Sequence, residues 1–284
     1  MNIGLVLAGG FAKGAYQIGA LQALNNFIPV DEIKYMSCTS IGALNGYAYI
    51  TKNLEAAKQM WTSACRDDAR LWVTKILRSN MLQEKIANLH SLNKTISSAF
   101  YCSLFDVTNR NVVYQDLSKV DNKDVPLYLK ASIALPAYSH AVHIGDMTCY
   151  DGGLIDNIPV FPLLKHDLDY IICIYFDDTC YKFENDNFDN RIIKLTFPSE
   201  SMIKHSFIVT QERIEEMIKG GYDRTMEVLE SVFAKGYDNL DSVYGAIGKL
   251  NQENPNPNSL RLTTDVVITN LNKATQKLTN KKII

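Results

Sequence analysis

The chain has 284 residues, of which 46% are hydrophobic and 21% are charged, and its formal net charge is -2. This length is enough to bury a full core, and one α/β domain of this size is ordinary. The weak net charge and the absence of RNP, zinc-finger or basic-helix patterns argue against nucleic acid as a partner. Six cysteines without C-x-x-C spacing predict reduced, structural thiols and no zinc.

The N-terminus shows no basic leader, and no stretch approaches the roughly 20 apolar residues that span a bilayer. We therefore expect a cytoplasmic protein, or one exported by a route without an N-terminal signal. Peripheral contact with a membrane stays open, and the sequence sets no oligomeric state.

The first predicted element is a short buried strand over residues 2–8, followed by a glycine-rich turn over residues 9–14 and then a helix. Such a turn presents backbone N–H groups to an anion. A Walker loop would need Gly-Lys-Ser/Thr where this chain has Lys-Gly-Ala, and Phe11 occupies the middle glycine position of G-x-G-x-x-G. The turn therefore favours an oxyanion hole over a nucleotide site.

A second strand, beginning near Ile33, breaks at Ser40 into a helix rich in glycine and alanine. This is the layout of a nucleophile elbow, in which a tight strand-to-helix turn exposes the serine hydroxyl. Gly42 meets the need for a small residue, whereas Cys38 stands where G-x-S-x-G has its first glycine. The structural alternative for Ser40 is a helix N-cap.

The middle of the chain is predicted to alternate helices and strands. Residues 53–100 are mostly helical in pattern, and we favour core packing over a lid for them. Strands are expected over Tyr101–Val107 and Asn111–Gln115, and a helix over Pro126–Ala134. An extended stretch, His140–Tyr150, follows this helix.

The extended stretch leads to Asp151, which precedes Gly152 and Gly153 in the only Asp-Gly of the chain. A strand end followed by glycines turns sharply and can present a carboxylate. The structural alternative is an ordinary Asp-Gly turn.

The second half is predicted to complete the sheet and to add helices. Asp167–Phe176 and Arg191–Phe197 have the composition of buried strands. Ile203–Phe233 has a helical pattern interrupted at Gly220-Gly221, and Leu240–Leu250 predicts a second helix. The sequence at 254–258 is typical of a linker. We therefore predict one domain over 1–253 and a polar tail over 254–284.

Taken together, these segments resemble the patatin-like phospholipase family. The resemblance lies in residues 5–17 for the oxyanion loop, 39–45 for the nucleophile and 151–159 for the aspartate, with 131–136 resembling the stretch before that aspartate. It implies a three-layer α/β/α sandwich with a mostly parallel central sheet. It also implies hydrolysis of acyl esters in lipids by a Ser40/Asp151 dyad, without histidine, cofactor or metal.

Under this resemblance, Ser40 attacks the ester carbonyl, Asp151 accepts its proton, and the amides of Gly9, Gly10 and Phe11 stabilise the oxyanion. Water then releases the fatty acid from an acyl-serine. The supporting residues are Lys13, Gly14, Gly42, Gly152 and Gly153. Lys13 is interpreted either as orienting the turn or attracting a phosphate headgroup, or as a surface lysine at a helix end.

Two alternatives stay open. One is a Ser-His-acid triad that uses His166 or His205, although we expect all five histidines to be structural. The other is a catalytically weak or inactive lipid-binding or regulatory descendant, motivated by Phe11 and Cys38 in place of glycines.

Overall fold

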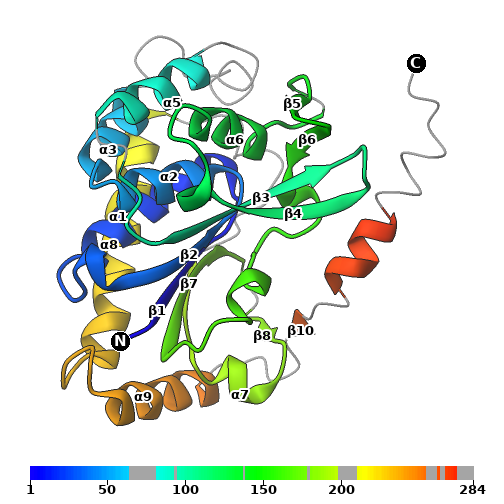
Figure 1. Cartoon of the computed structure of the whole chain (residues 1–284). Helices are drawn as coiled ribbons and strands as arrows, with labels where there is room; N and C mark the ends of the chain where they lie inside the picture. Colours follow the sequence, from blue (N-terminus) through cyan, green and yellow to red (C-terminus); the bar gives the residue numbers. More distant parts are fainter. Residues whose placement is uncertain are drawn as a thin grey trace.

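The computed structural model describes residues 1–63, 81–92, 95–136, 138–177, 180–197, 210–253, 261–262 and 266–273. Its centre is an eight-stranded mixed sheet of order β5-β6-β3-β2-β1-β7-β9, in which β4 pairs with β3 outside this path (Figure 1). The parallel strands are β1 (Ile3–Leu7), β2 (Ile33–Cys38), β3 (Ala99–Asp106), β7 (Tyr170–Phe176) and β9 (Ile192–Phe197). The antiparallel ones are β4 (Asn111–Asp116), β5 (Val142–Ile144) and β6 (Met147–Asp151).

The central strands are buried on both faces, which explains their continuous apolar runs. Every residue of β1 and of β7 is buried. Leu7 lies opposite Cys38 on one side and Ile174 on the other. Because these strands are parallel, the glycine-rich turn after β1 and the Ser40 turn after β2 emerge at the same edge of the sheet.

Helices cover one face of the sheet. They are α1 (Gly14–Leu24), α2 (Ile41–Ile50), α3 (Leu54–Ser63), α5 (Met81–Leu92), α6 (Val125–Ser132), α8 (Gln211–Val232) and α9 (Leu240–Gln252). Side chains of these helices share one apolar core with the sheet. Ala57, Trp61 and Leu89 belong to this core, so α3 and α5 pack as predicted. The other face carries a second, smaller core beneath short elements that include α7 (Asp186–Asp189).

The predicted interruption at Gly220-Gly221 is wrong, because α8 runs unbroken through both glycines. The glycines serve a close approach instead: a Cβ at Gly221 would lie 2.0 Å from the carbonyl oxygen of Tyr16 in α1. The part of this predicted helix before residue 210 lies outside the described residues.

The predicted extended stretch over His140–Tyr150 is a hairpin, in which β5 and β6 pair across a turn at Gly145. Gly145 has a φ of 56°, which glycine adopts without strain. The strand pair predicted over 101–115 is confirmed by β3 and β4, and the helix predicted near 126–134 by α6.

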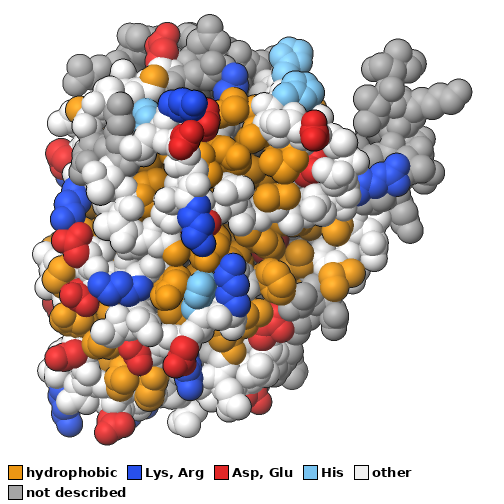
Figure 2. Space-filling model, viewed as in Figure 1, with side chains coloured by type: hydrophobic (Ala, Val, Ile, Leu, Met, Phe, Trp, Pro, Cys, Tyr) orange, Lys and Arg blue, Asp and Glu red, His pale blue; other side chains and the backbone are white. Residues whose placement is uncertain are grey.

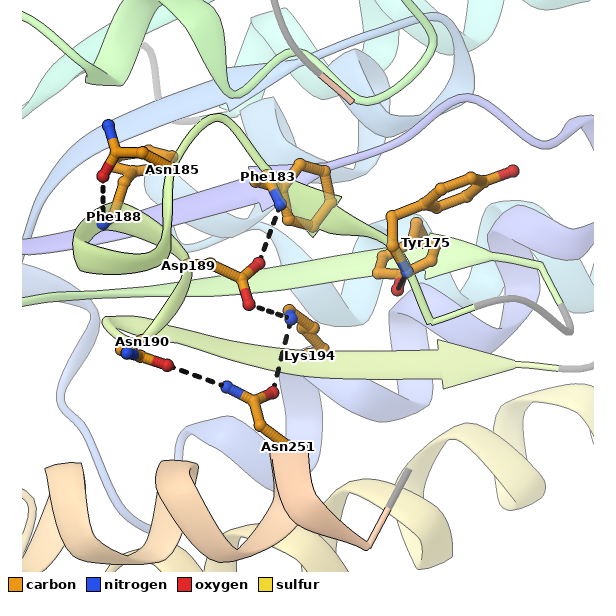
Figure 3. Close-up of polar contacts among 9 residues, drawn as sticks. Tyr175, Phe183, Asn185, Phe188, Asp189, Asn190, Lys194 and Asn251 are labelled. Atoms are coloured by element: carbon orange, nitrogen blue, oxygen red, sulfur yellow. Dashed lines mark hydrogen bonds and ion pairs between the residues drawn. The ribbon is translucent and has the colours of Figure 1, made fainter. Parts of the chain in front are cut away.

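Far from Ser40 along the sheet, a buried ion pair joins β9 to its neighbours (Figure 3). Lys194 Nζ lies 2.8 Å from Asp189 Oδ2, and both side chains are only 6% exposed. Asp189 also accepts a 2.8 Å hydrogen bond from the Phe183 amide of β8 (Lys182–Phe183). Lys194 Nζ also donates a 3.3 Å hydrogen bond to Asn251 Oδ1 of α9. The pair therefore connects α7, β8, β9 and α9.

Two stretches of the predicted polar tail contact the domain. β10 (Arg261–Leu262) pairs with β8, and Asn270 of the helical segment 266–273 donates a 3.1 Å hydrogen bond to the Ile155 carbonyl. The boundary at 253 stays a prediction, and the linker predicted at 254–258 lies outside the described residues. On the face shown in Figure 2, positive and negative side chains are interspersed around apolar ones. Among the described helices, none combines the length and apolar character needed to cross a bilayer.

Candidate active site

Ser40 occupies the turn between β2 and α2 in a strained backbone conformation, with φ 56° and ψ -130°. A non-glycine residue pays of order 1–3 kcal/mol for such a conformation and keeps it only where the surroundings enforce it. The Thr39 amide donates to the Leu7 carbonyl at 3.0 Å, and a Cβ at Gly42 would lie 2.5 Å from that same oxygen. The predicted strand-to-helix turn is therefore present, and α2 begins directly against β1.

Ser40 occupies the N-cap position of α2, but its side chain makes no capping hydrogen bond, so helix capping does not explain its hydroxyl. Cys38 lies fully buried at the end of β2, where a Cβ at Gly46 would lie 2.7 Å from its sulfur. Burial raises the pKa of the Cys38 thiol well above its ordinary value. Cys38 is therefore a packing residue at this turn.

Asp151 ends β6 and is only 2% exposed. Its carboxylate accepts a 2.8 Å hydrogen bond from the Gly153 amide. Burial raises the pKa of Asp151 to about 7, and the neighbouring Ser40 side chain and the Gly153 amide offset only part of that effect. The structure thus brings Ser40 and Asp151 together from opposite halves of the first 151 residues.

The stretch 131–136 also has a position in this site, since the Asp151 amide donates to the Ala134 carbonyl at 2.8 Å. Gly14, Gly152 and Gly153 lie where an added Cβ would approach a neighbouring atom to 2.8, 2.6 and 3.0 Å. The predicted supporting glycines are therefore positions of close packing around the turn.

The glycine-rich loop passes beside Ser40 and is tied to the segment after Asp151. A Cβ at Gly9 would lie 2.9 Å from the Ser40 Cβ. The Gly9 amide donates to the Asn157 carbonyl at 3.2 Å, and Asn157 Nδ2 donates to the Gly9 carbonyl at 3.1 Å. Because the Gly9 N–H is directed at Asn157, its predicted oxyanion role is not supported. The roles of Gly10 and Phe11 stay predictions.

Phe11 has a left-handed backbone with a φ of 52°, a conformation that glycine adopts most readily. Lys13 is 9% exposed, and its Nζ lies 5.4 Å from the centroid of the Phe176 ring. The interpretation of Lys13 as a surface lysine is therefore wrong. A cation over an aromatic face in a buried setting is attractive, so Lys13 holds the loop against the end of β7.

A cavity of about 230 Å³ adjoins this loop, and its wall includes Asn157, Phe161, Phe176 and Asp156. Asp156 is a second buried carboxyl group, which accepts a 2.5 Å hydrogen bond from the Tyr114 hydroxyl. Burial raises its pKa to about 7 as well. The two carboxyl groups differ in their partners, since that of Asp151 contacts Ser40 and that of Asp156 contacts Tyr114.

His90 and His166 have partners away from Ser40. Nδ1 of His90 lies 2.7 Å from the Tyr47 hydroxyl, and Nε2 of His166 lies 2.9 Å from the Tyr101 hydroxyl. The His166 ring also stacks on Tyr35 at 4.0 Å between centroids. These contacts support structural roles for both, whereas His205 lies outside the described residues.

A strained serine at a strand-to-helix turn, beside a glycine-rich loop and a buried carboxyl group on a central mixed sheet, has the arrangement of a nucleophile elbow in an α/β protein. Residues 5–164, more than half of the chain, match the family model described as patatin-like phospholipase. The chain belongs to the patatin-like phospholipase family.

Two relatives and one solved structure are similar to this chain. Lysophospholipase NTE1 of Cryptococcus neoformans var. neoformans serotype D is 31% identical over 184 residues, which cover 61% of this chain and 11% of that protein. An uncharacterized NTE family protein of Mycobacterium tuberculosis is 24% identical over 181 residues, covering 61% of this chain and 30% of that protein. The chain thus spans a small part of these relatives. The crystal structure of VipD from Legionella pneumophila shares the fold, with a TM-score of 0.53, 12% identity and coverage of 100% of this chain and 81% of that one.

Proposed function

We propose that this protein is a lipid acyl hydrolase in which Ser40 is the nucleophile and Asp151 the general base. The observation that carries the proposal is a strained elbow serine beside a buried carboxyl group whose pKa is raised to about 7. A base with a pKa near the working pH is deprotonated in a substantial fraction of the molecules at that pH and is still basic enough to accept a proton from the nucleophile. An ordinary aspartate, at about 3.9, is a much weaker base.

In the proposed reaction, Ser40 Oγ attacks the ester carbonyl and its proton passes to Asp151. The tetrahedral intermediate expels the alcohol, which takes that proton, and leaves an acyl-serine. A water molecule then attacks the acyl carbonyl while Asp151 accepts its proton, and the acid is released as Ser40 regains a proton. The loop amides of Gly10 and Phe11 are the proposed donors to the oxyanion.

The substrate class proposed is a phospholipid or lysophospholipid acyl ester. Membership of a phospholipase family and a relative named lysophospholipase support it. Peripheral contact with a membrane or micelle surface is part of the same proposal, because such substrates are found there.

The alternative is a lipid-binding descendant without turnover. It is motivated by Phe11 and Cys38, which stand where the family pattern has glycines. The structure favours activity, because Cys38 packs inside the turn and Phe11 adopts a left-handed backbone that is also accessible to glycine. Both departures therefore leave the Ser40–Asp151 geometry in place.

The test is labelling with a fluorophosphonate probe together with hydrolysis of p-nitrophenyl butyrate and of lysophosphatidylcholine micelles. Ser40→Ala should abolish labelling, and Asp151→Asn should abolish turnover. Asp156→Asn is the matched control, since it neutralises a second buried carboxyl group while leaving an acceptor for Tyr114; it should retain turnover. His166→Ala should retain it also. Folded wild-type protein that neither labels nor hydrolyses any of these esters would favour the lipid-binding alternative.

A further inference from the structure

Three buried polar side chains connect α1, α2 and α3, which contact one another on one face of the sheet (Figure 1). Gln17 and Asn45 are fully buried, and Trp61 is 3% exposed. A buried amide group is costly unless its donors and acceptors are satisfied. These side chains satisfy one another and two backbone carbonyls, so their polarity has a function in the fold.

The hydrogen bonds run in one direction. Trp61 Nε1 donates to Asn45 Oδ1 at 3.1 Å, Asn45 Nδ2 donates to Gln17 Oε1 at 2.9 Å, and Gln17 Nε2 donates to the Ala8 carbonyl at 2.8 Å. The second hydrogen of Asn45 Nδ2 serves the Gly14 carbonyl at 2.9 Å. Because the Trp61 indole can only donate and the Gly14 carbonyl can only accept, the orientation of the Asn45 amide is determined.

The two carbonyls are the ends of the glycine-rich loop. Ala8 immediately precedes Gly9, and Gly14 begins α1. Asn45 stands on α2, the helix that starts directly after Ser40. The network therefore ties both ends of the loop to the helix that carries the nucleophile.

We propose that Gln17 and Asn45 are positioning residues that set the loop amides relative to Ser40; this inference rests on the proposed function. Oxyanion donors work only when they are aimed at the developing charge, and a misplacement of about 1 Å can cost about 100-fold in rate. Ground-state binding of the substrate does not depend on that aim. The network should therefore influence kcat more than KM.

The first variant is Gln17→Met, which keeps the approximate shape of the side chain but removes both the donor to the Ala8 carbonyl and the acceptor for Asn45 Nδ2. We expect kcat and the rate of fluorophosphonate labelling to fall by about 10- to 100-fold while KM stays within about twofold. Asn45→Asp, which keeps the acceptor for Trp61 but removes both donors, should have a similar or larger effect.

Two controls separate positioning from general destabilisation. Trp61→Phe removes only the outermost donor and should stay within about threefold of wild-type kcat. Thr51→Val removes the 2.7 Å hydrogen bond to the Tyr47 carbonyl at the far end of α2 and should leave kcat unchanged. Equal losses in all four variants would mean that the network is only structural.

Hydrogen exchange measured by mass spectrometry on peptides covering residues 8–14 gives a readout that does not need turnover. Loop amides should exchange at least about tenfold faster in Gln17→Met than in wild type or Trp61→Phe. Unchanged exchange together with wild-type kcat in Gln17→Met would overturn the inference. An inactive wild type would refute the proposed function, whereas the exchange comparison would still decide whether Gln17 holds the loop.

Discussion

Asp151 and Asp189 both carry buried carboxyl groups, since only 2% and 4% of the whole-residue surface is exposed. The two groups have different partners. Asp189 forms an ion pair with Lys194 and accepts from the Phe183 amide (Figure 3). The polar neighbours of the Asp151 carboxyl group are the Gly153 amide and the Ser40 side chain, and no cation forms an ion pair with it among the residues that the structure describes.

The difference shows how burial can serve two purposes. A buried carboxyl group paired with a cation joins elements of the fold. One beside neutral donors has its pKa raised towards neutrality, so it can exchange a proton under working conditions.

The sharpest test of the comparison is Asp151→Asn, for which we expect a loss of about 10³-fold or more in kcat. The folded-state pKa of Asp151 is raised above its unfolded value, so its stability contribution is present below about pH 4 and is lost as pH rises through about 7. Removing the ionisable group should therefore leave the melting temperature at pH 8 unchanged or higher. Thermal unfolding and ester hydrolysis measure the two effects, and a large drop in melting temperature would contradict this account.

The counterpart is Asp189→Asn, which keeps an acceptor for the Phe183 amide but leaves the buried Lys194 charge without its partner. We expect about 3–5 kcal/mol of lost unfolding free energy, with kcat per folded molecule retained. Denaturant unfolding measures the loss of unfolding free energy. Ester hydrolysis combined with active-site titration measures kcat per folded molecule.

Adding Lys194→Met to Asp189→Asn should recover most of that loss, because no buried charge then remains. If the double variant is as unstable as the single one, the ion pair is not what Asp189 contributes.

The comparison also predicts a pH dependence of catalysis. Because Asp151 must be deprotonated to act as a base, kcat/KM should rise about tenfold per pH unit below about 7 and level off above it. The pH profile of p-nitrophenyl butyrate hydrolysis measures this. Asp189→Asn should leave the profile unchanged, and activity already constant from pH 5 upward would argue against Asp151 as the base.

The smallest effect concerns backbone strain near the site. Phe11→Gly should raise the free energy of unfolding by about 1 kcal/mol, because Phe11 has a φ of 52°. Arg110→Gly is the matched control, since Arg110 has a φ of 53° in the turn between β3 and β4. Both should gain similar stability in denaturant unfolding, and only Phe11→Gly should change kcat.

Local sequence was sufficient for the elements whose signal is local. The apolar runs predicted β1, β7 and β9, and small residues around Ser40 predicted its strand-to-helix turn, because burial on both faces and a tight turn each limit the residue types allowed. The aspartate before two glycines indicated a carboxyl group at a strand end.

Only the tertiary structure decided which groups contact which. It directs the Gly9 amide at Asn157, buries Lys13 beneath Phe176, and carries α8 through Gly221 because Tyr16 lies against it. It also joins Gln17 to Asn45, 28 residues away, and brings Asp151 to Ser40. Periodicity and turn chemistry report the environment of single residues, whereas these contacts depend on how distant segments pack. The raised pKa of Asp151 arises in the same way, because desolvation is a property of the folded surroundings and not of the residue itself.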